Sequence, residues 1–398
     1  METQIKTSAS GLKIKVVGIG CLGIRATNRM VESLLQGDEI IAIGASAFAT
    51  SKSKASHKIC ICRKIRGTGT SGNIDIARNE AYASRDLIRK HLGKSDLVIL
   101  IAGLGGGTGT GATPVITRLA KETGALVLVI VTLPFEREGR IRFLKARQGI
   151  HELKKLADCL VVISNDRLIE LSRKRIFSLE AFLSADEAAD QVVRAIVEPI
   201  ARQDLENAEY AEFKARVTSG GFTILGFGES SSDRGATEAV TRALDNSLLE
   251  GSDFQRAKSV FICFFLSHSL SDLEIEDACR MADKRLTPET PVIARIVITD
   301  EGLENVRAIV FGIGIDVPEH LEGKMKYHPE RRGPRGSLFY DAEQTNIPAF
   351  LRKNPSNELV QYYFSGKERL DRRKEEADCH SLMPSNSGNS SNNLKEGN

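Results

Sequence analysis

The sequence predicts an α/β fold in which a parallel-sheet domain is joined by a long central helix to a smaller α/β domain, followed by a flexible C-terminal tail. Three observations support this prediction. Short apolar runs rich in valine and isoleucine alternate with helical segments in the first half of the chain, which is typical of strands buried on both faces of a parallel sheet. One long helical pattern covers residues 178–203. After Val317 the composition changes to basic residues, glycine and proline.

The apolar runs predict the positions of the strands. In the first half they are Lys13–Ile19, Ile40–Ile43, Leu97–Ile101, Leu126–Val131 and Leu160–Ile163. In the second block they are Ser259–Leu266, Val292–Thr299 and Val306–Ile315. Ligands of parallel sheets bind beyond the carboxyl ends of the strands, so a site is expected in the loops that follow them. Pro199 lies inside the central helical pattern and is expected to kink it, because an interior proline costs about 3 kcal/mol.

Composition excludes several classes of protein. The 398-residue chain has 55 basic and 52 acidic side chains, and the resulting net charge of +3 gives no reason to expect nucleic-acid binding. Seven cysteines without a framework of spacings argue against a disulfide scaffold and for a reducing compartment. No apolar run approaches the roughly 20 residues of a membrane span, and residues 1–11 lack a signal core. We therefore expect a cytoplasmic protein.

The strongest local signal is the segment Gly103–Gly111, which has six glycines in nine residues between a buried strand and a helix predicted to start near Ala112. Glycine lets the backbone approach a ligand closely, and backbone N–H groups at a helix N-terminus bind anions. Thr108 and Thr110 add hydroxyl donors. The segment therefore predicts a phosphate site. It is not a Walker loop, because the lysine of that motif is missing.

This glycine segment resembles the signature of the tubulin/FtsZ family of polymerising GTPases, and of FtsZ in particular. Further segments match the family's motifs in the same order. They are Phe135–Arg142, Ser164–Leu168, Ala181–Glu187, Asn207–Glu212, Gly226–Glu229, Asn246–Glu250 and Ile309–Asp316. The resemblance covers about residues 12–317.

The resemblance implies a site for GTP or GDP with Mg²⁺. Backbone amides of residues 105–111 would hold the phosphates, Glu138 and Arg142 would lie near the ribose and phosphates, and Asn165 and Asp186 would face the guanine. The complete implied set is Gly20, Cys21, Arg25, Gly105, Gly106, Gly107, Thr108, Gly109, Thr110, Gly111, Glu138, Arg142, Asn165 and Asp186.

For hydrolysis, the resemblance implies that Glu209 and Glu212 reach the nucleotide of the next subunit in a head-to-tail homopolymer. They would polarise the attacking water and help to hold Mg²⁺; the sequence identifies no other metal ligand. The implied function is a filament-forming GTPase of cell division, acting at the division site. The alternative is a nucleotide-binding structural filament or division regulator with little or no GTPase activity.

The implied domain organisation has seven parts. They are a disordered N-terminus (1–11), a GTP-binding domain (12–180), a central helix (181–203), a second domain (204–317), a basic linker (318–345), a partner-binding peptide (346–353) and a mostly disordered tail (354–398). The peptide resembles the C-terminal FtsZ segment that binds membrane tethers and division proteins. Its residues for that contact would be Ile347, Pro348, Phe350, Leu351 and Arg352.

The sequence departs from the family in two places near the expected nucleotide. In the first loop Cys21, Leu22, Ile24 and Arg25 are expected to add bulk where backbone should approach phosphate. The loop Gly44–Ser46 lacks the family's carboxylate. This missing acid also argues against a Rossmann oxidoreductase, although the spacing of Gly18, Gly20 and Gly23 fits the dinucleotide fingerprint.

The expected catalytic acids also differ from the family. Both are glutamates, one methylene longer than the family's aspartates, and a misplacement of about 1 Å can cost on the order of 100-fold in rate. We therefore expect slow or altered turnover, in a divergent paralogue of a more typical partner.

Overall fold

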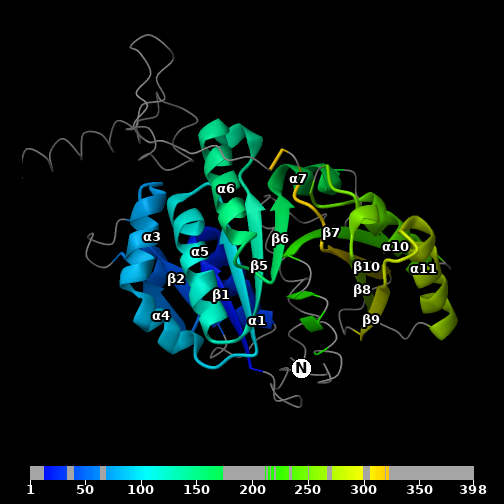
Figure 1. Cartoon of the computed structure of the whole chain (residues 1–398), viewed down its shortest axis with the longest axis horizontal. Coiled ribbons are helices and arrows are strands. Elements are labelled where there is room, and N and C mark those ends of the chain that lie inside the picture. Colours follow the sequence, from blue (N-terminus) through cyan, green and yellow to red (C-terminus); the bar gives the residue numbers. More distant parts are fainter. Residues whose placement is uncertain are drawn as a thin grey trace, which may run out of the picture. The chain divides into compact units, whose positions relative to one another are not determined.

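The computed structural model describes residues 13–33, 40–62, 69–173, 211, 214–215, 217–218, 221–232, 235–249, 251–266, 271–298, 305–318 and 320–321. The chain separates into two compact units, residues 1–331 and 332–398, and every described residue belongs to the first (Figure 1). The expected central helix, the sites at Asp186, Glu209 and Glu212, and the peptide 346–353 lie outside the described residues.

The described strands form one mixed sheet with the order β3-β2-β1-β4-β5-β6-β7-β10-β8-β9. Their bounds are β1 (Ile14–Ile19), β2 (Ile40–Gly44), β3 (His57–Cys60), β4 (Leu97–Gly103), β5 (Leu126–Leu133), β6 (Cys159–Ser164), β7 (Gly221–Ser230), β8 (Ser259–Leu266), β9 (Val292–Ile298) and β10 (Val306–Ile313). Strands β1 to β6 pair in parallel, which confirms the predicted parallel sheet of the first half. The predicted strand positions agree with the structure to within two residues at each end.

The second half continues the same sheet. Strand β7 pairs in parallel with β6 over three residues, whereas β10 runs antiparallel to both β7 and β8. At the edge, β8 and β9 are parallel again. The smaller α/β region predicted from the sequence therefore shares hydrogen bonds with the first domain through the β6–β7 pair. Strands β3 and β7 were not among the predicted strands.

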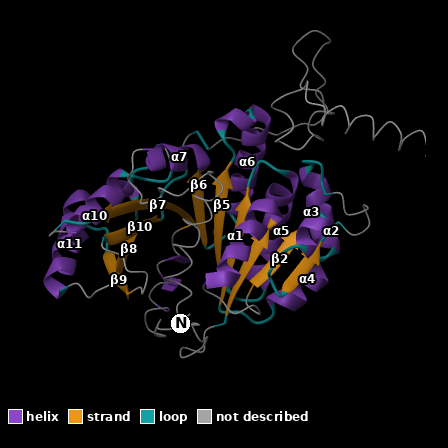
Figure 2. Ribbon diagram, turned by 180° about the vertical axis from the view of Figure 1, so that it is seen from behind, coloured by secondary structure: helices purple, strands orange, loops and turns teal. Residues whose placement is uncertain are grey.

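Helices cover both faces of the sheet (Figure 2). They are α1 (Gly20–Ser33), α2 (Ala47–Ser51), α3 (Ile74–Ala83), α4 (Arg85–Leu92), α5 (Gly107–Glu122), α6 (Arg140–Leu153), α7 (Asn165–Arg173), α10 (Gly235–Asp245) and α11 (Asp272–Arg285), with short 3₁₀ turns η2 (Glu136–Glu138) and η3 (Phe254–Arg256). No helix among the described residues is both long and apolar enough to cross a bilayer.

Neighbouring residues of each central strand belong to different hydrophobic clusters, because side chains alternate between the two faces of a sheet. Val17 and Leu100 pack in the larger cluster, which contains residues of α3 to α6, α10 and α11. Val16 and Ile99 pack in the smaller cluster, which contains residues of α1 and α7. Burial on both faces explains why these strands are continuous apolar runs.

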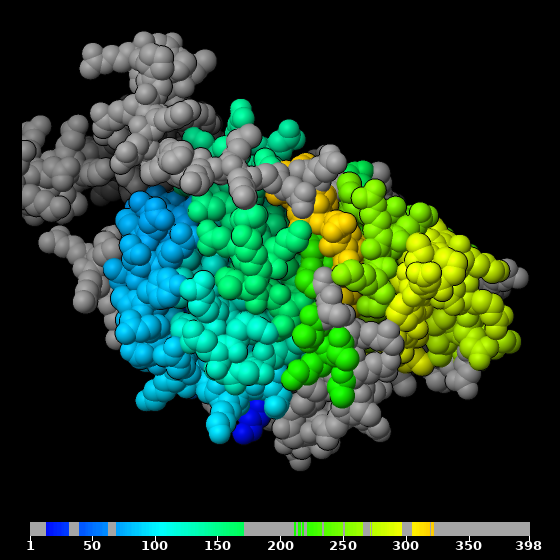
Figure 3. All heavy atoms as spheres, in the orientation of Figure 1, coloured from blue at the N-terminus to red at the C-terminus, as the bar shows by residue number. Residues whose placement is uncertain are grey.

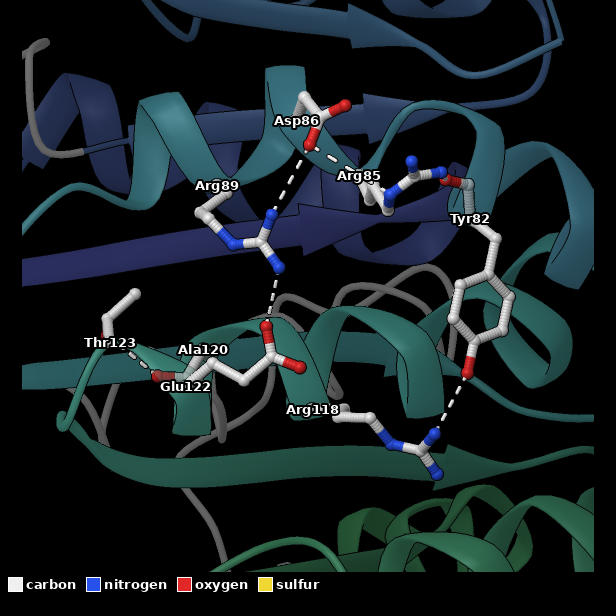
Figure 4. Close-up of polar contacts among 8 residues, drawn as sticks. All are labelled: Tyr82, Arg85, Asp86, Arg89, Arg118, Ala120, Glu122 and Thr123. Atoms are coloured by element: carbon white, nitrogen blue, oxygen red, sulfur yellow. Dashed lines mark hydrogen bonds and ion pairs between the residues drawn. The ribbon is translucent and has the colours of Figure 1, made fainter.

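Helix α5 lies between α3 and α6, and the three helices form one continuous surface in the space-filling view (Figure 3). Polar contacts also join α5 to the helices beside it (Figure 4). Arg89 of α4 donates to Glu122 at 2.6 Å, and Arg118 donates to the Tyr82 hydroxyl at 3.0 Å. Exposed contacts of this kind are screened by water and contribute little to stability. Burial of its apolar residues is therefore what mainly fixes α5.

Candidate functional site

Two helix N-termini lie side by side at the carboxyl ends of β1 and β4, which are neighbours in the sheet with Ile19 opposite Ala102. Strand β1 runs directly into α1 at Gly20, which has a left-handed φ of +72°. A Cβ added to Gly20 would lie 3.5 Å from the backbone nitrogen of Gly109, in the first turn of α5. Helix N-termini carry unpaired N–H groups and a partial positive charge, which attract anions, so this pair is the candidate anion cradle of the protein.

Several glycines of the turn between β4 and α5, here called the second turn, are required by packing. A Cβ on Gly107 would lie 2.3 Å from the Thr70 hydroxyl oxygen, and one on Gly109 would lie 2.0 Å from the carbonyl oxygen of Gly103. A Cβ on Gly111 would lie 2.2 Å from the carbonyl oxygen of Ile74. These glycines let α5 lie against the neighbouring loop, strand and helix. Helix α5 starts at Gly107, five residues before the predicted start at Ala112, so these glycines belong to its first turns.

Gly106 is different, because neither packing nor backbone conformation requires a glycine there. Its φ is −86°, and nothing in the described part of the chain lies within 4 Å of an added Cβ. It is also the N-cap residue of α5, where no side chain accepts a hydrogen bond from the helix. The space in front of Gly106 is thus open to a ligand at the point where unpaired backbone N–H groups gather.

The two threonines of this turn have different surroundings. Thr110 is 1% exposed, and its hydroxyl oxygen accepts a hydrogen bond of 2.9 Å from the backbone N–H of Gly105. That bond closes the turn, in which Gly105 has a φ of +93°. Thr108 is only partly buried, and its hydroxyl lies 3.4 Å from that of Thr70. Thr108 is therefore the more accessible of the two hydroxyls.

In the turn between β1 and α1, here called the first turn, bulky side chains were expected to obstruct the ligand. This expectation is wrong for Leu22 and Ile24. Both lie inside α1 and pack toward the sheet; Ile24 is 6% exposed. Glycines across the sheet leave the space for them, since a Cβ on Gly44 would lie 3.1 Å from Ile24 Cδ1 and one on Gly103 would lie 3.2 Å from Leu22 Cβ. Of the four residues, Cys21 is the exposed one, and Arg25 is half-buried.

Glu138 and Arg142 form an ion pair beside the second turn. The Glu138 carboxylate also accepts a hydrogen bond of 3.0 Å from the backbone N–H of Phe135, which holds the 3₁₀ turn η2 in place. A Cβ on Gly105 would lie 3.0 Å from the carbonyl oxygen of Arg142. Glu138 and Arg142, which are expected near the ribose and phosphates, thus lie next to the glycine turn.

Asn165 stands at the end of β6, as the first residue of α7. It is 6% exposed, and its Oδ1 atom accepts no hydrogen bond from any described residue. A buried acceptor without a donor costs about 1–3 kcal/mol, which a ligand donor would recover. The adjacent Asp166 accepts a hydrogen bond of 2.8 Å from the backbone N–H of Glu136, which ties this loop to η2.

Lys145 is a site neighbour that the motifs did not reveal. It follows Arg142 by three residues in α6, and its ammonium donates a hydrogen bond of 2.7 Å to the carbonyl oxygen of Gly72. Burial, together with the nearby Arg142, lowers the pKa of Lys145 below the ordinary lysine value. Its helical spacing from Arg142 was the only sequence signal for this position.

The described residues contain no group of three or more histidine, cysteine or acidic side chains that would hold a metal. Asp186, Glu209 and Glu212 are not among these residues. The described part of the candidate site therefore consists of the two glycine turns, the Glu138–Arg142 pair, Asn165 and the loop around Gly72.

Family models match both halves of the chain. Residues 13–173 match the GTPase domain of the tubulin/FtsZ family, and residues 221–316 match the C-terminal domain of the FtsZ family. Among curated relatives, the cell division protein FtsZ of Aquifex aeolicus is 33% identical over 86% of this chain and 96% of its own length. The cell division protein FtsZ 1 of Thermococcus kodakarensis is 37% identical over 81% of this chain and 87% of its own.

Solved structures give the same assignment. A structure of an empty FtsZ dimer from M. jannaschii has a TM-score of 0.70 and 34% identity, covering 77% of this chain and 89% of its own. A GTPγS-bound protofilament of CetZ2 from Haloferax volcanii has a TM-score of 0.64, covering 78% of this chain and 95% of its own. At 17% identity the latter supports the fold alone.

Proposed function

Because the chain belongs to the tubulin/FtsZ family of GTPases, we propose that it is a GTP-binding subunit of a cell-division filament that hydrolyses GTP where two subunits meet. We further propose that it acts in the cytoplasm at the division site. Its relatives in Aquifex and Thermococcus are named cell division proteins, which supports this role.

The proposal depends on the open space at Gly106, the N-cap residue of α5, whose first turn lies beside the N-terminus of α1. Unpaired backbone N–H groups of residues 106–109, at the start of α5, and those of Gly20 and Cys21 would hold the phosphates of GTP or GDP. Thr108 would add a hydroxyl and Arg25 a positive charge, whereas Thr110 would act mainly by closing the turn around Gly105. Fixed amide dipoles of this kind bind phosphate without needing to reorganise.

Asn165 supports guanine as the base. Its buried Oδ1 would accept a hydrogen bond from the N1–H or N2–H groups of guanine, which adenine lacks. Asp186 would supply a second acceptor on the same edge of the base. A site that leaves a buried polar atom unpaired with the wrong ligand discriminates strongly against that ligand. We therefore propose selectivity for GTP over ATP.

The Glu138–Arg142 pair would hold the ribose and the adjoining phosphates. The Glu138 carboxylate is oriented by the backbone N–H of Phe135, so it is positioned before a ligand arrives. Arg142 would then share its charge between this carboxylate and a phosphate oxygen. Charge-assisted hydrogen bonds of this type are roughly twice as strong as neutral ones.

For hydrolysis we propose that Glu209 and Glu212 of one subunit face the nucleotide of the next in a head-to-tail homopolymer. Their carboxylates would orient and polarise the attacking water. A bound Mg²⁺ would neutralise charge on the phosphates. Glu209 and Glu212 would help to hold this ion together with the phosphate oxygens of the nucleotide. The longer glutamate side chains lead us to propose slow turnover.

We retain the domain bounds 12–180, 181–203 and 204–317 as proposals, with 318–345 as a linker and 346–353 as a peptide for membrane tethers or division proteins. A more typical paralogue as a co-polymer partner is likewise proposed. The alternative function is a nucleotide-binding filament or division regulator that does not hydrolyse GTP. This alternative would use the same nucleotide cradle. It differs only in that Glu209 and Glu212 would not promote hydrolysis.

The decisive experiment follows assembly and phosphate release together. Light scattering of the purified chain with GTP, GDP and a non-hydrolysable GTP analogue tests whether assembly depends on the nucleotide. Phosphate release per subunit should rise with protein concentration, because each active site needs two subunits. Glu209→Ala and Glu212→Ala should abolish release while GTP binding persists. Concentration-independent hydrolysis would contradict the shared site, and no release from the wild type would favour the alternative.

A further inference from the structure

The loop of residues 69–73 forms one wall of the anion cradle. The Thr70 hydroxyl lies 3.4 Å from that of Thr108 in the first turn of α5. A Cβ on Gly107 would lie 2.3 Å from the Thr70 hydroxyl oxygen and 2.9 Å from the backbone nitrogen of Asn73. Any displacement of this loop would therefore change the surroundings of the N-terminus of α5.

The loop adopts a costly conformation. Gly69 and Gly72 have φ values of +95° and +77°, and Ser71, which carries a side chain, has a φ of 47°. Left-handed backbone is unfavourable for a residue with a Cβ, so such a turn persists when contacts around it hold it. At its end, Asn73 is fixed as the N-cap of α3, where its side chain accepts hydrogen bonds from Asp75 and Ile76. The strained centre of the loop needs a separate anchor.

Lys145 supplies that anchor from another element. Its ammonium reaches from α6 to the carbonyl oxygen of Gly72 at 2.7 Å. The side chain is part-buried and lies one helical turn from Arg142, whose carbonyl oxygen borders Gly105. Helix α6 thus contacts the glycine turn through Arg142 and the loop 69–73 through Lys145.

We propose that Lys145 is a positioning residue of the nucleotide site: its ammonium holds the loop 69–73 against the N-terminus of α5, and nucleotide affinity depends on this bond. The inference rests on the proposed function, since it assumes that the cradle binds a guanine nucleotide. Lys145 acts through the loop. Burial and the neighbouring Arg142 lower the pKa of Lys145, so the protein keeps an ammonium there at an electrostatic cost.

The test compares Lys145→Met, Lys145→Arg and Lys155→Met by titration with fluorescent N-methylanthraniloyl-GDP. Lys155 lies ten residues further along, is exposed beyond the end of α6, and forms no ion pair with a described residue. Lys145→Met should weaken binding about tenfold, as the loss of a charge-assisted bond that orders a wall of the site would. Lys145→Arg should stay within about threefold of the wild type, and Lys155→Met should not change affinity.

Hydrogen exchange adds a direct readout of the loop. Amides 70–73 should exchange faster in Lys145→Met and at the wild-type rate in Lys155→Met. Wild-type affinity in a folded Lys145→Met variant would overturn the inference while leaving the proposed function intact. Failure of the wild type to bind any guanine nucleotide would overturn both. Should Lys145→Met not fold, Lys145→Gln is measured by the same criteria.

Discussion

The turn between β1 and α1 and the turn between β4 and α5 both use glycine for close packing, but the second turn also contains a glycine with open space around it. In the first turn, a Cβ on Gly18 would lie 2.3 Å from the carbonyl oxygen of Gly23, and one on Gly23 would lie 2.2 Å from that of Ile101. Those two glycines let α1 lie directly on the sheet. In the second turn, Gly106 has open space where its side chain would be.

The difference shows that a glycine-rich segment holds two kinds of glycine. One kind makes room for other parts of the protein, and the second makes room for a ligand. Substitution should separate them, because adding a methyl group at a packing glycine disrupts the fold, whereas adding it at Gly106 disrupts only binding. Measurements of stability and of nucleotide affinity on single variants therefore test the distinction between the two kinds of glycine.

The largest expected effect is that of Gly109→Ala. The added Cβ would lie 2.0 Å from the carbonyl oxygen of Gly103, which is backbone and cannot turn away. Overpacking of this kind costs about 1–3 kcal/mol or more, so we expect a loss of at least 3 kcal/mol in the free energy of unfolding. Urea denaturation followed by circular dichroism measures it. A variant as stable as the wild type would show that Gly109 is not a packing glycine.

Gly106→Ala should leave the fold intact. At this φ, alanine is compatible with the backbone, and its gain of up to about 1 kcal/mol through the unfolded state offsets its poorer preference for the N-cap position, so stability should change little. The methyl group would stand in the open space of the cradle, so GTP affinity should fall at least about tenfold. Thermal unfolding and calorimetric titration together check both halves of this expectation. Unchanged affinity would mean that the ligand does not approach Gly106.

Asn165→Leu tests the orphaned acceptor at the other end of the site. Removing a buried oxygen without a donor should leave stability unchanged or slightly higher. GTP affinity should fall about tenfold, while the weak affinity for ATP should change little, so the preference for GTP shrinks. Competition binding with the two nucleotides measures the preference. An equal loss for both nucleotides would place Asn165 away from the base.

Thiol labelling gives the smallest perturbation and compares Cys21 with the buried cysteines. Burial raises the pKa of Cys62 to about 11 and that of Cys159 to about 12, so below those values both thiols stay protonated and unreactive. Among the cysteines that the structure describes, a maleimide at pH 8 should modify the exposed Cys21 first, and GDP should slow that reaction. Peptide mass spectrometry identifies the site. Labelling of Cys21 at the same rate with and without GDP would remove it from the nucleotide site.

The strands could be predicted because burial on both faces leaves a continuous apolar run. Strand β7 was missed because Gly226 and Gly228 interrupt its pattern. The structure shows why they are there, since a Cβ on either would lie about 2 Å from backbone oxygens of α10, at Ala243 and Ala239. The close packing of α10 on β7 requires glycine at these two positions. This requirement comes from a tertiary contact, and the local apolar pattern of the sequence does not reveal it.

The site was predictable where a motif is continuous in sequence, as in Gly103–Gly111. The orientation of Leu22 and Ile24 was not, because it depends on Gly103 and Gly44, which lie across the sheet. The anchoring of the 69–73 loop by Lys145 also joins segments far apart in the chain. Contacts between residues so far apart in the chain cannot be predicted from a single sequence.

We propose that the N-termini of α1 and α5 together hold the phosphates of a guanine nucleotide. Hydrogen exchange of the wild-type chain with and without GDP tests it most directly. Binding of GDP should slow the exchange of the amides at residues 20–22 and at residues 106–109 in the same sample. Protection of only one of the two turns, or of neither while GDP is bound, would contradict it.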